Sequence, residues 1–121
     1  MAFFDFASNI AETKETHYNT QLRTRYYKAR YNKIKEYLLD YAKANALMIK
    51  SEDDVHGEIF IQASNYHMIV SMVQVTPMEC AVDIKVQTYG LIGLFKPFKL
   101  IKKCYVFLDS KSSFKGVGLR P

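Results

Sequence analysis

The middle of the chain, from Val55 to Tyr89, is rich in hydrophobic residues, and in its first and third parts these residues alternate with polar ones. Breaks at residues 64–65 and 76–78 divide it into three segments, and Pro77 in the second break has no backbone N–H to donate to a sheet. Alternation with a period of two is typical of a half-buried β-strand. The pattern therefore predicts three antiparallel strands joined by tight turns, which together form a β-meander.

The second and third predicted strands differ in how many of their faces are apolar. The third has one apolar and one polar face: Cys80, Val82, Ile84 and Val86 against Asp83, Lys85 and Gln87. The second, at about residues 66–75, is apolar on both faces. Such a strand is typical of a sheet centre covered on both sides, or of a face that meets a partner or a ligand.

Before the meander, no Pro or Gly interrupts the chain from about Glu12 to Asn45. Apolar and tyrosine residues recur there at steps of three to five positions, namely Leu22, Tyr26, Ala29, Ile34, Tyr37, Leu38 and Tyr41. This spacing predicts one long amphipathic helix, or two helices with a break near residue 20. Residues 46–49 fit either a last helical turn or the start of a strand.

After the meander, Pro97 fits the first turn of a second amphipathic helix, from about residue 97 to residue 109. Apolar residues at steps of three and four support this helix, namely Phe98, Ile101, Tyr105 and Leu108. Residues 104–108 also fit a strand. Residues 110–121 are expected to form a tail with one short extended segment at 114–119.

These elements predict an α+β fold: a long N-terminal amphipathic helix, a three-stranded antiparallel β-meander, and a C-terminal amphipathic helix packed on the sheet. The length of 121 residues predicts a single domain, residues 1–121. Residues 1–11 are expected to be a loosely attached apolar segment. Its Phe3, Phe6 and Ile10 share helical spacing, so we expect them to pack on the domain or on a partner.

The composition, 49% hydrophobic and 24% charged, is that of an ordinary soluble globular protein. No apolar run approaches the roughly 18 residues of a membrane-spanning helix, and the first residues lack the basic region of a secretory signal. Two cysteines are too few for a disulfide framework in a chain of this length. We therefore predict a cytoplasmic protein in which Cys80 and Cys104 are reduced and buried.

Charge is distributed unevenly around the net value of +5. Residues 23–50 carry eight Lys or Arg against two acids, and residues 96–121 carry seven against one. Residues 51–95 carry one Lys against six acids. Two basic arms thus flank an acidic middle. They either neutralise this middle within the fold or present a basic surface to an acidic partner, and we favour the first interpretation.

No motif in the sequence assigns a catalytic residue, a cofactor or a metal site. His56 and Glu58 share a predicted strand face that His67 could approach, but the close ligand pairs typical of structural zinc are absent. Gly90 and Gly93 enclose apolar residues and lack the Lys and Ser/Thr of a phosphate-binding loop. The sequence therefore favours a protein that is not an enzyme.

We predict a non-catalytic binding module that self-associates, since a homodimer would hide a free sheet edge and the extra apolar face of the second strand. Two alternatives remain. In the first, nucleic acid binds the basic, tyrosine-rich helix expected at residues 23–35, through Arg23, Arg25, Lys28, Arg30 and Lys35. In the second, a small apolar or anionic-headed ligand lies between sheet and helix. The residues that would contact this ligand or a partner are Arg23, Arg30, Tyr26, Tyr37, Met68 and Met72.

Overall fold

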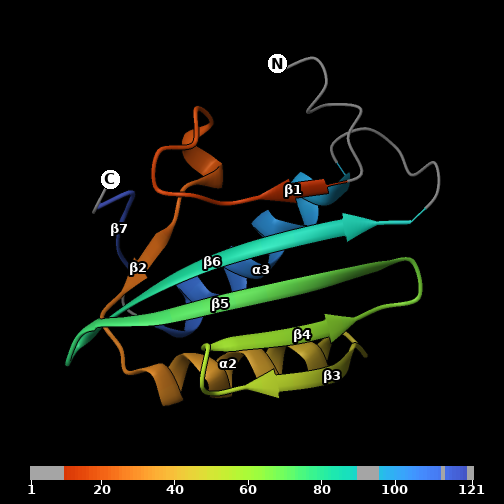
Figure 1. The fold of residues 1–121 in the computed structure, drawn as a ribbon, viewed down its shortest axis with the longest axis horizontal. Helices are drawn as coiled ribbons and strands as arrows, with labels where there is room; N and C mark the ends of the chain where they lie inside the picture. Colours follow the sequence, from red (N-terminus) through yellow and green to blue (C-terminus); the bar gives the residue numbers. More distant parts are fainter. Residues whose placement is uncertain (1–9, 90–95, 113, 120–121) are drawn as a thin grey trace.

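The computed structural model describes residues 10–89, 96–112 and 114–119, which form seven strands, two α-helices and one 3-10 turn. The strands are β1 (Ile10–Glu12), β2 (Arg25–Tyr27), β3 (Met48–Asp53), β4 (Glu58–Gln62), β5 (Tyr66–Thr76), β6 (Glu79–Thr88) and β7 (Phe114–Val117). The helices are α2 (Tyr31–Ala44) and α3 (Lys96–Lys111), and the 3-10 turn η1 spans Thr20–Leu22. All seven strands belong to one sheet, and α3 lies behind it in Figure 1.

Strand β6 is the centre of the sheet because it pairs with three other strands. The strand order is β3-β4-β5-β6-β2-β7, with β1 as an additional neighbour of β6, and every pairing is antiparallel. Strand β5 follows one edge of β6. The other edge is shared, since β1 pairs with residues 85–87 and β2 with residues 80–82. Thus β1 and β2 lie end to end along β6, and they meet it on either side of residues 83–84.

The residues between β1 and β2 form a loop that is closed at its base. The amide of Lys14 donates to the carbonyl of Leu22 at 3.1 Å, and the amide of Thr24 donates to the carbonyl of Lys14 at 3.3 Å. Asn19 begins η1, where its side chain accepts a hydrogen bond from the amide of Gln21 at 2.9 Å. The loop therefore returns the chain to the edge of β6 that it left.

The core lies between the sheet and the two helices. The helices contribute buried residues mostly three or four positions apart, namely Ile34, Leu38, Tyr41, Ile101, Cys104, Tyr105 and Leu108. The central strands contribute every second residue, namely Ile59, Ile61, Met68, Val70, Met72, Cys80, Val82, Ile84 and Val86. Burial of one large aliphatic side chain contributes roughly 1.5–3 kcal/mol. This alternating set therefore decides which face of each strand points inward.

The predicted long N-terminal helix is wrong, because α2 begins only at Tyr31 and strand β2 precedes it. Tyr26 and Tyr27 point to opposite faces of the sheet. The hydroxyl of Tyr27 donates to Asp109 of α3 at 2.7 Å, while that of Tyr26 donates to Glu15 of the loop before β2. Aromatic residues fit a strand well, and the pairing of β2 with both β6 and β7 outweighs the weak helical spacing of this segment.

The predicted three-stranded meander is also wrong as a complete sheet. Its three segments are the central strands β4, β5 and β6, which four further strands flank. Residues 48–53 pair with β4 as strand β3, and residues 104–108 belong to helix α3. The predictions for residues 1–9 and 90–95 concern positions outside the described residues. Neither of the described helices is long and apolar enough to cross a membrane.

Gly57 closes the turn between β3 and β4 with a positive φ of 69°. Its carbonyl accepts from the amide of Met72 at 2.7 Å, and a Cβ atom here would overlap the carbonyl oxygen of Met72. We predict that Gly57→Ala lowers the free energy of unfolding by about 2–4 kcal/mol, because backbone strain adds to a displaced strand pair. Urea denaturation measures this loss.

The matched control is Val55→Ala in the same turn. Val55 is 89% exposed, so this variant should change the free energy of unfolding by no more than about 0.5 kcal/mol. Equal losses for the two variants would contradict the close approach of Gly57 to β5.

Candidate functional site on the open face of the sheet

The strand register defines a sheet face that points away from the core. Directly opposite residues of an antiparallel pair share a face, so the residues that alternate with the core set lie together on the other side. We name this side the open face: Ile10, Glu12, Met48, Glu58, Phe60, Gln62, His67, Ile69, Ser71, Val73, Asp83, Lys85 and Gln87. Both described helices pack on the core side, so neither covers it.

Three rings meet on the open face. Phe60 and His67 stack with their ring centroids 5.1 Å apart, and the rings of His67 and Tyr89 are 5.8 Å apart. The hydroxyl of Tyr89 lies 2.9 Å from Nδ1 of His67, and it accepts a hydrogen bond from the side-chain amide of Gln62 at 2.9 Å. We name Phe60, His67 and Tyr89 the aromatic cluster. These contacts hold its rings in a fixed arrangement at the surface.

A bulge in β3 adds a positive charge to the aromatic cluster. The register between β3 and β4 shifts between Ile49 and Ser51, which leaves Lys50 as the extra residue. The Nζ atom of Lys50 lies 5.3 Å from the centroid of the Phe60 ring. This distance is within the range of a cation–π contact. The bulge thus redirects a lysine over an aromatic surface, as bulges commonly do.

A polar hollow of about 270 Å³ lies on the same face, where the edge of β6 changes its partner from β1 to β2. Its lining combines three carboxylates, one ammonium group and two hydroxyls with the atoms of two isoleucines: Glu12, Thr13, Glu58, Ile69, Ser71, Asp83, Ile84 and Lys85. The hollow therefore lies where it does because β6 pairs with two different strands along one edge.

Asp83 is the most constrained charged group of the hollow. Its Oδ1 atom accepts hydrogen bonds from the hydroxyls of Thr13 at 2.6 Å and Thr24 at 2.7 Å. Burial raises the pKa of Asp83, the two hydroxyls oppose this shift, and the charges of Glu15 and Glu12 add to it. A half-buried carboxyl group with a raised pKa beside an opening is a frequent mark of a functional site.

Thr13 connects Asp83 to the helix layer on the other side of the sheet. Its hydroxyl oxygen accepts from the amide of Ile84 at 2.9 Å and lies 3.2 Å from the hydroxyl of Tyr105 in α3. The Tyr105 hydroxyl in turn donates to the carbonyl of Val82 at 2.8 Å. A continuous set of polar contacts therefore passes through the sheet at the point where β1 ends.

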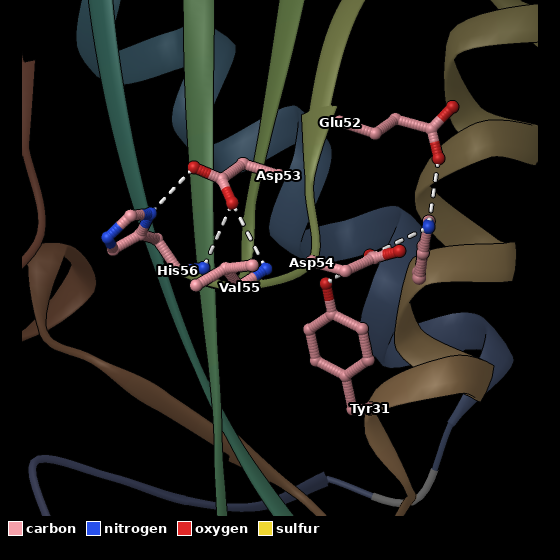
Figure 2. A network of polar contacts seen from close by, with 7 residues as sticks. Tyr31, Glu52, Asp53, Asp54, Val55 and His56 are labelled. Atoms are coloured by element: carbon pink, nitrogen blue, oxygen red, sulfur yellow. Dashed lines mark hydrogen bonds and ion pairs between the residues drawn. The ribbon is translucent and has the colours of Figure 1, made fainter.

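A second polar network holds the turn between β3 and β4 against α2 (Figure 2). Lys35 of α2 lies 2.9 Å from Glu52 and 2.8 Å from Asp54, and the hydroxyl of Tyr31 donates to Asp54 at 2.9 Å. The hydrogen bond to Asp54, and then the one to Glu52, raises the pKa of Lys35. Burial and the bond to Asp54 raise the pKa of Tyr31 to about 12.

Asp53 orders the same turn from within, as Figure 2 shows. Its Oδ1 atom accepts from the amides of Val55 at 3.0 Å and His56 at 3.1 Å, and its Oδ2 atom lies 2.7 Å from Nδ1 of His56. The contact with Asp53 raises the pKa of His56. Because the three carboxylates of this network are exposed, its ion pairs stabilise the fold only weakly. We therefore assign the network to turn geometry rather than to a binding site.

The six residues predicted to contact a small ligand do not converge. The two methionines fill the core, whereas Tyr26 is buried on the opposite face, where it bonds to the loop before β2. Arg23 donates to a loop carbonyl at 2.8 Å. Arg30 is exposed at the start of α2, and Tyr37 lies half-buried along that helix.

The basic face predicted on a helix at residues 23–35 does not form, because part of this segment is strand β2. Arg25 is engaged with an aspartate of α3 at 3.0 Å, and Lys35 is engaged with the turn after β3. Lys28 and Arg30 are exposed in the connection between β2 and α2. The predicted basic, tyrosine-rich helix at residues 23–35 is therefore wrong, and its cations do not share one helical face.

Neither cysteine is placed for nucleophilic chemistry. Both are free thiols in the core, where burial raises the pKa of Cys80 to about 11 and that of Cys104 to about 12. His56 belongs to the turn after β3, whereas His67 belongs to the aromatic cluster. In the part of the chain that the structure describes, no three His, Cys, Asp or Glu side chains are grouped so as to hold a metal ion.

Sequence reasoning missed both parts of the open face. Alternation placed Phe60 and Asp83 on polar strand faces, but it did not bring Phe60 beside His67, because that contact depends on the register between β4 and β5. Thr13 and Thr24 were assigned to a helix. Their only available signal was that β-branched residues favour strands.

No protein-family model matches this chain, and no curated protein is significantly similar to it in sequence. The candidate site is therefore defined by the geometry of the described residues.

Asp83 is expected to lower the stability of the fold at neutral pH. Because its pKa is raised in the folded chain, stability falls as the pH rises from the ordinary carboxyl value through the raised one. We predict that Asp83→Asn unfolds at a higher urea concentration than wild type at pH 7, since Asn can still accept from both threonines. The difference should shrink toward pH 3, where the wild-type carboxyl group is protonated. An Asp83→Asn variant that is less stable at pH 7 would contradict this assignment.

Proposed function

We propose that this protein is a non-catalytic binding module that pairs with a second copy of itself through the open face. One observation carries the proposal: a sheet face that neither described helix covers exposes aromatic and aliphatic side chains together. Met48 is 59% exposed and Ile10 is 43% exposed, and the strand register places both in the same row across the sheet as His67 of the aromatic cluster. Apolar surface gathered in one place favours association with another surface.

The size of the open face supports a partner as large as a protein. The face is five strands wide, with about 4.8 Å between neighbouring strands, and about eight residues long, at about 3.4 Å per residue. Treated as flat, it has an area on the order of 500 Å². Specific protein pairs bury roughly 800 Å² on each partner. The open face is thus smaller than the average interface, which fits a reversible dimer of moderate affinity.

The charges of the open face support pairing with a second copy. Glu12 lies directly opposite Lys85 in the register between β1 and β6, and the face also carries Glu58, Asp83 and, beside Phe60, Lys50. A surface with both signs can meet its own copy with opposite charges facing each other. A partner with charges of only one sign would leave either the carboxylates or the lysines of this face unmatched.

The sheet edges are less suited to self-association than the open face. The β3 edge carries Lys50, Glu52, Asp53 and a bulge, which are features that oppose the addition of another strand. The β7 edge is only 4 residues long. We therefore infer a face-to-face pair rather than a continued sheet.

A carrier of small ligands between sheet and helices has less support, because side chains with no exposed surface occupy that space, including Ile34, Leu38 and Met68. The cytoplasm remains the compartment that we propose, because both thiols are free and a reducing environment preserves such thiols.

Sedimentation velocity between roughly 1 and 100 µM, the range of moderate affinities, tests the pairing. We expect a reversible dimer for the wild type. Phe60→Ser combined with Ile69→Thr should weaken the dimer at least about tenfold, which corresponds to about 1.4 kcal/mol, because it removes apolar contact while keeping residues that strands tolerate.

The matched control combines Val55→Thr with Met78→Thr, which removes exposed apolar side chains from two turns outside the open face. It should leave the dimer unchanged. A wild type that stays monomeric over the whole range, or an equal loss in the control, would reject the proposal.

A further inference from the structure

Helix α3 presents a row of exposed lysines on the side of the molecule away from the open face. The outer surface of the helix consists of Lys99, Lys102, Lys103, Val106, Ser110 and Lys111. Its inner surface is buried against the sheet and α2. At 1.5 Å per residue, the row from Lys99 to Lys111 is about 18 Å long. Four positive charges thus lie on the exposed side of one helix.

These lysines differ in what they contact from the cations that are held in ion pairs within the chain. Lys35 and Arg25 lie in ion pairs with carboxylates of their own chain. Within residues 10–89, 96–112 and 114–119, by contrast, Lys99, Lys102 and Lys103 are in no ion pair. Asp109, the one acid of α3, is already engaged by Arg25 and Tyr27. The positive potential of this row is therefore not cancelled locally.

We propose that the exposed face of α3 binds the phosphodiester backbone of a nucleic acid, without preference for base sequence. A matching partner must carry negative charge continuously over the length of the row. A duplex does so, with one phosphate charge per about 1.7 Å of its axis. Each lysine that contacts a phosphate releases bound counterions, which makes the binding favourable at low salt and weak at high salt.

The side chains of this face favour phosphate contact over base recognition, and they do not suit membrane insertion. The face has no Arg, Asn or Gln, and its lysines are flexible point charges rather than planar forks, which favours contact with phosphates over the reading of base edges. Val106, 59% exposed, is the single apolar residue among the lysines, whereas a helix that lies in a membrane surface needs a broad apolar face. The face therefore fits a hydrated, uniformly charged polymer.

This inference is independent of the proposed dimer. The open face and α3 lie on opposite sides of the sheet, so a dimer through the open face leaves both α3 helices accessible. A failure of either idea in its own test leaves the other in place.

Fluorescence anisotropy with two unrelated duplexes of about 25 base pairs tests the proposal. With four phosphate contacts, the affinity should fall about 100-fold when salt rises from 50 to 200 mM. The triple variant Lys99→Gln, Lys102→Gln and Lys103→Gln should lower the slope of log affinity against log salt by about 3. It should also bind at least about tenfold more weakly at 50 mM salt. Glutamine has a helix propensity close to that of lysine, so the fold should persist, and circular dichroism checks it.

The control triple is Lys14→Gln, Lys28→Gln and Arg30→Gln, which removes the same charge at exposed positions outside α3. It should leave both affinity and slope nearly unchanged. Equal effects of the two triples, no duplex binding at 50 mM salt, or a strong preference for one of the two sequences would overturn the proposal. Tighter binding to vesicles of anionic phospholipid or to polyglutamate than to duplex would also overturn it.

Discussion

The structure depends on the way in which one edge of β6 is divided between two strands. β1 pairs with one half of this edge and β2 with the other, and the chain between them leaves and returns at the same place. At the junction, the Thr13 amide donates to the carbonyl of Ile84 at 2.9 Å. The amide of Ile84 donates there to the hydroxyl oxygen of Thr13, a side-chain group that takes the place of a backbone carbonyl. A buried amide without a partner would destabilise the sheet by about 1–3 kcal/mol, so this hydroxyl stabilises the fold at the junction.

The same junction is in contact with both elements that carry a proposed binding surface, the open face of the sheet and helix α3. On the open face it places Asp83 among carboxylates and raises its pKa, and it forms the polar hollow next to the side chains that a second copy would cover. On the core face it contacts Tyr105, which belongs to the helix whose outer side carries the lysine row. The open face and the lysine-bearing face of α3 thus lie on opposite sides of the sheet. On α3 no carboxylate of the same helix is available to pair with the exposed lysines, because its one acid, Asp109, is engaged by Arg25 and Tyr27.

Sequence periodicity predicted the parts of the fold that are long and regular. Strands β4 to β6 and helix α3 follow from alternation and from three- to four-residue spacing, because many residues repeat the same environment. Strands β1 and β2 have 3 residues each, too few for a period, and Tyr26 matches helical spacing by chance. Their partners in β6 lie more than 50 residues away. The candidate site could not be predicted for the same reason, since the neighbours of Phe60 and Asp83 are set by register between strands.

The central claim, that Thr13 completes the sheet at the division of β6, is tested most directly by hydrogen exchange at the amide of Ile84. We predict that this amide is protected in the wild type and that Thr13→Val speeds its exchange about tenfold or more, because the mutation removes its acceptor. The amides of β5, a strand paired on both of its edges, should keep their protection. An Ile84 amide that exchanges freely in the wild type, or that Thr13→Val leaves unchanged, would contradict the account.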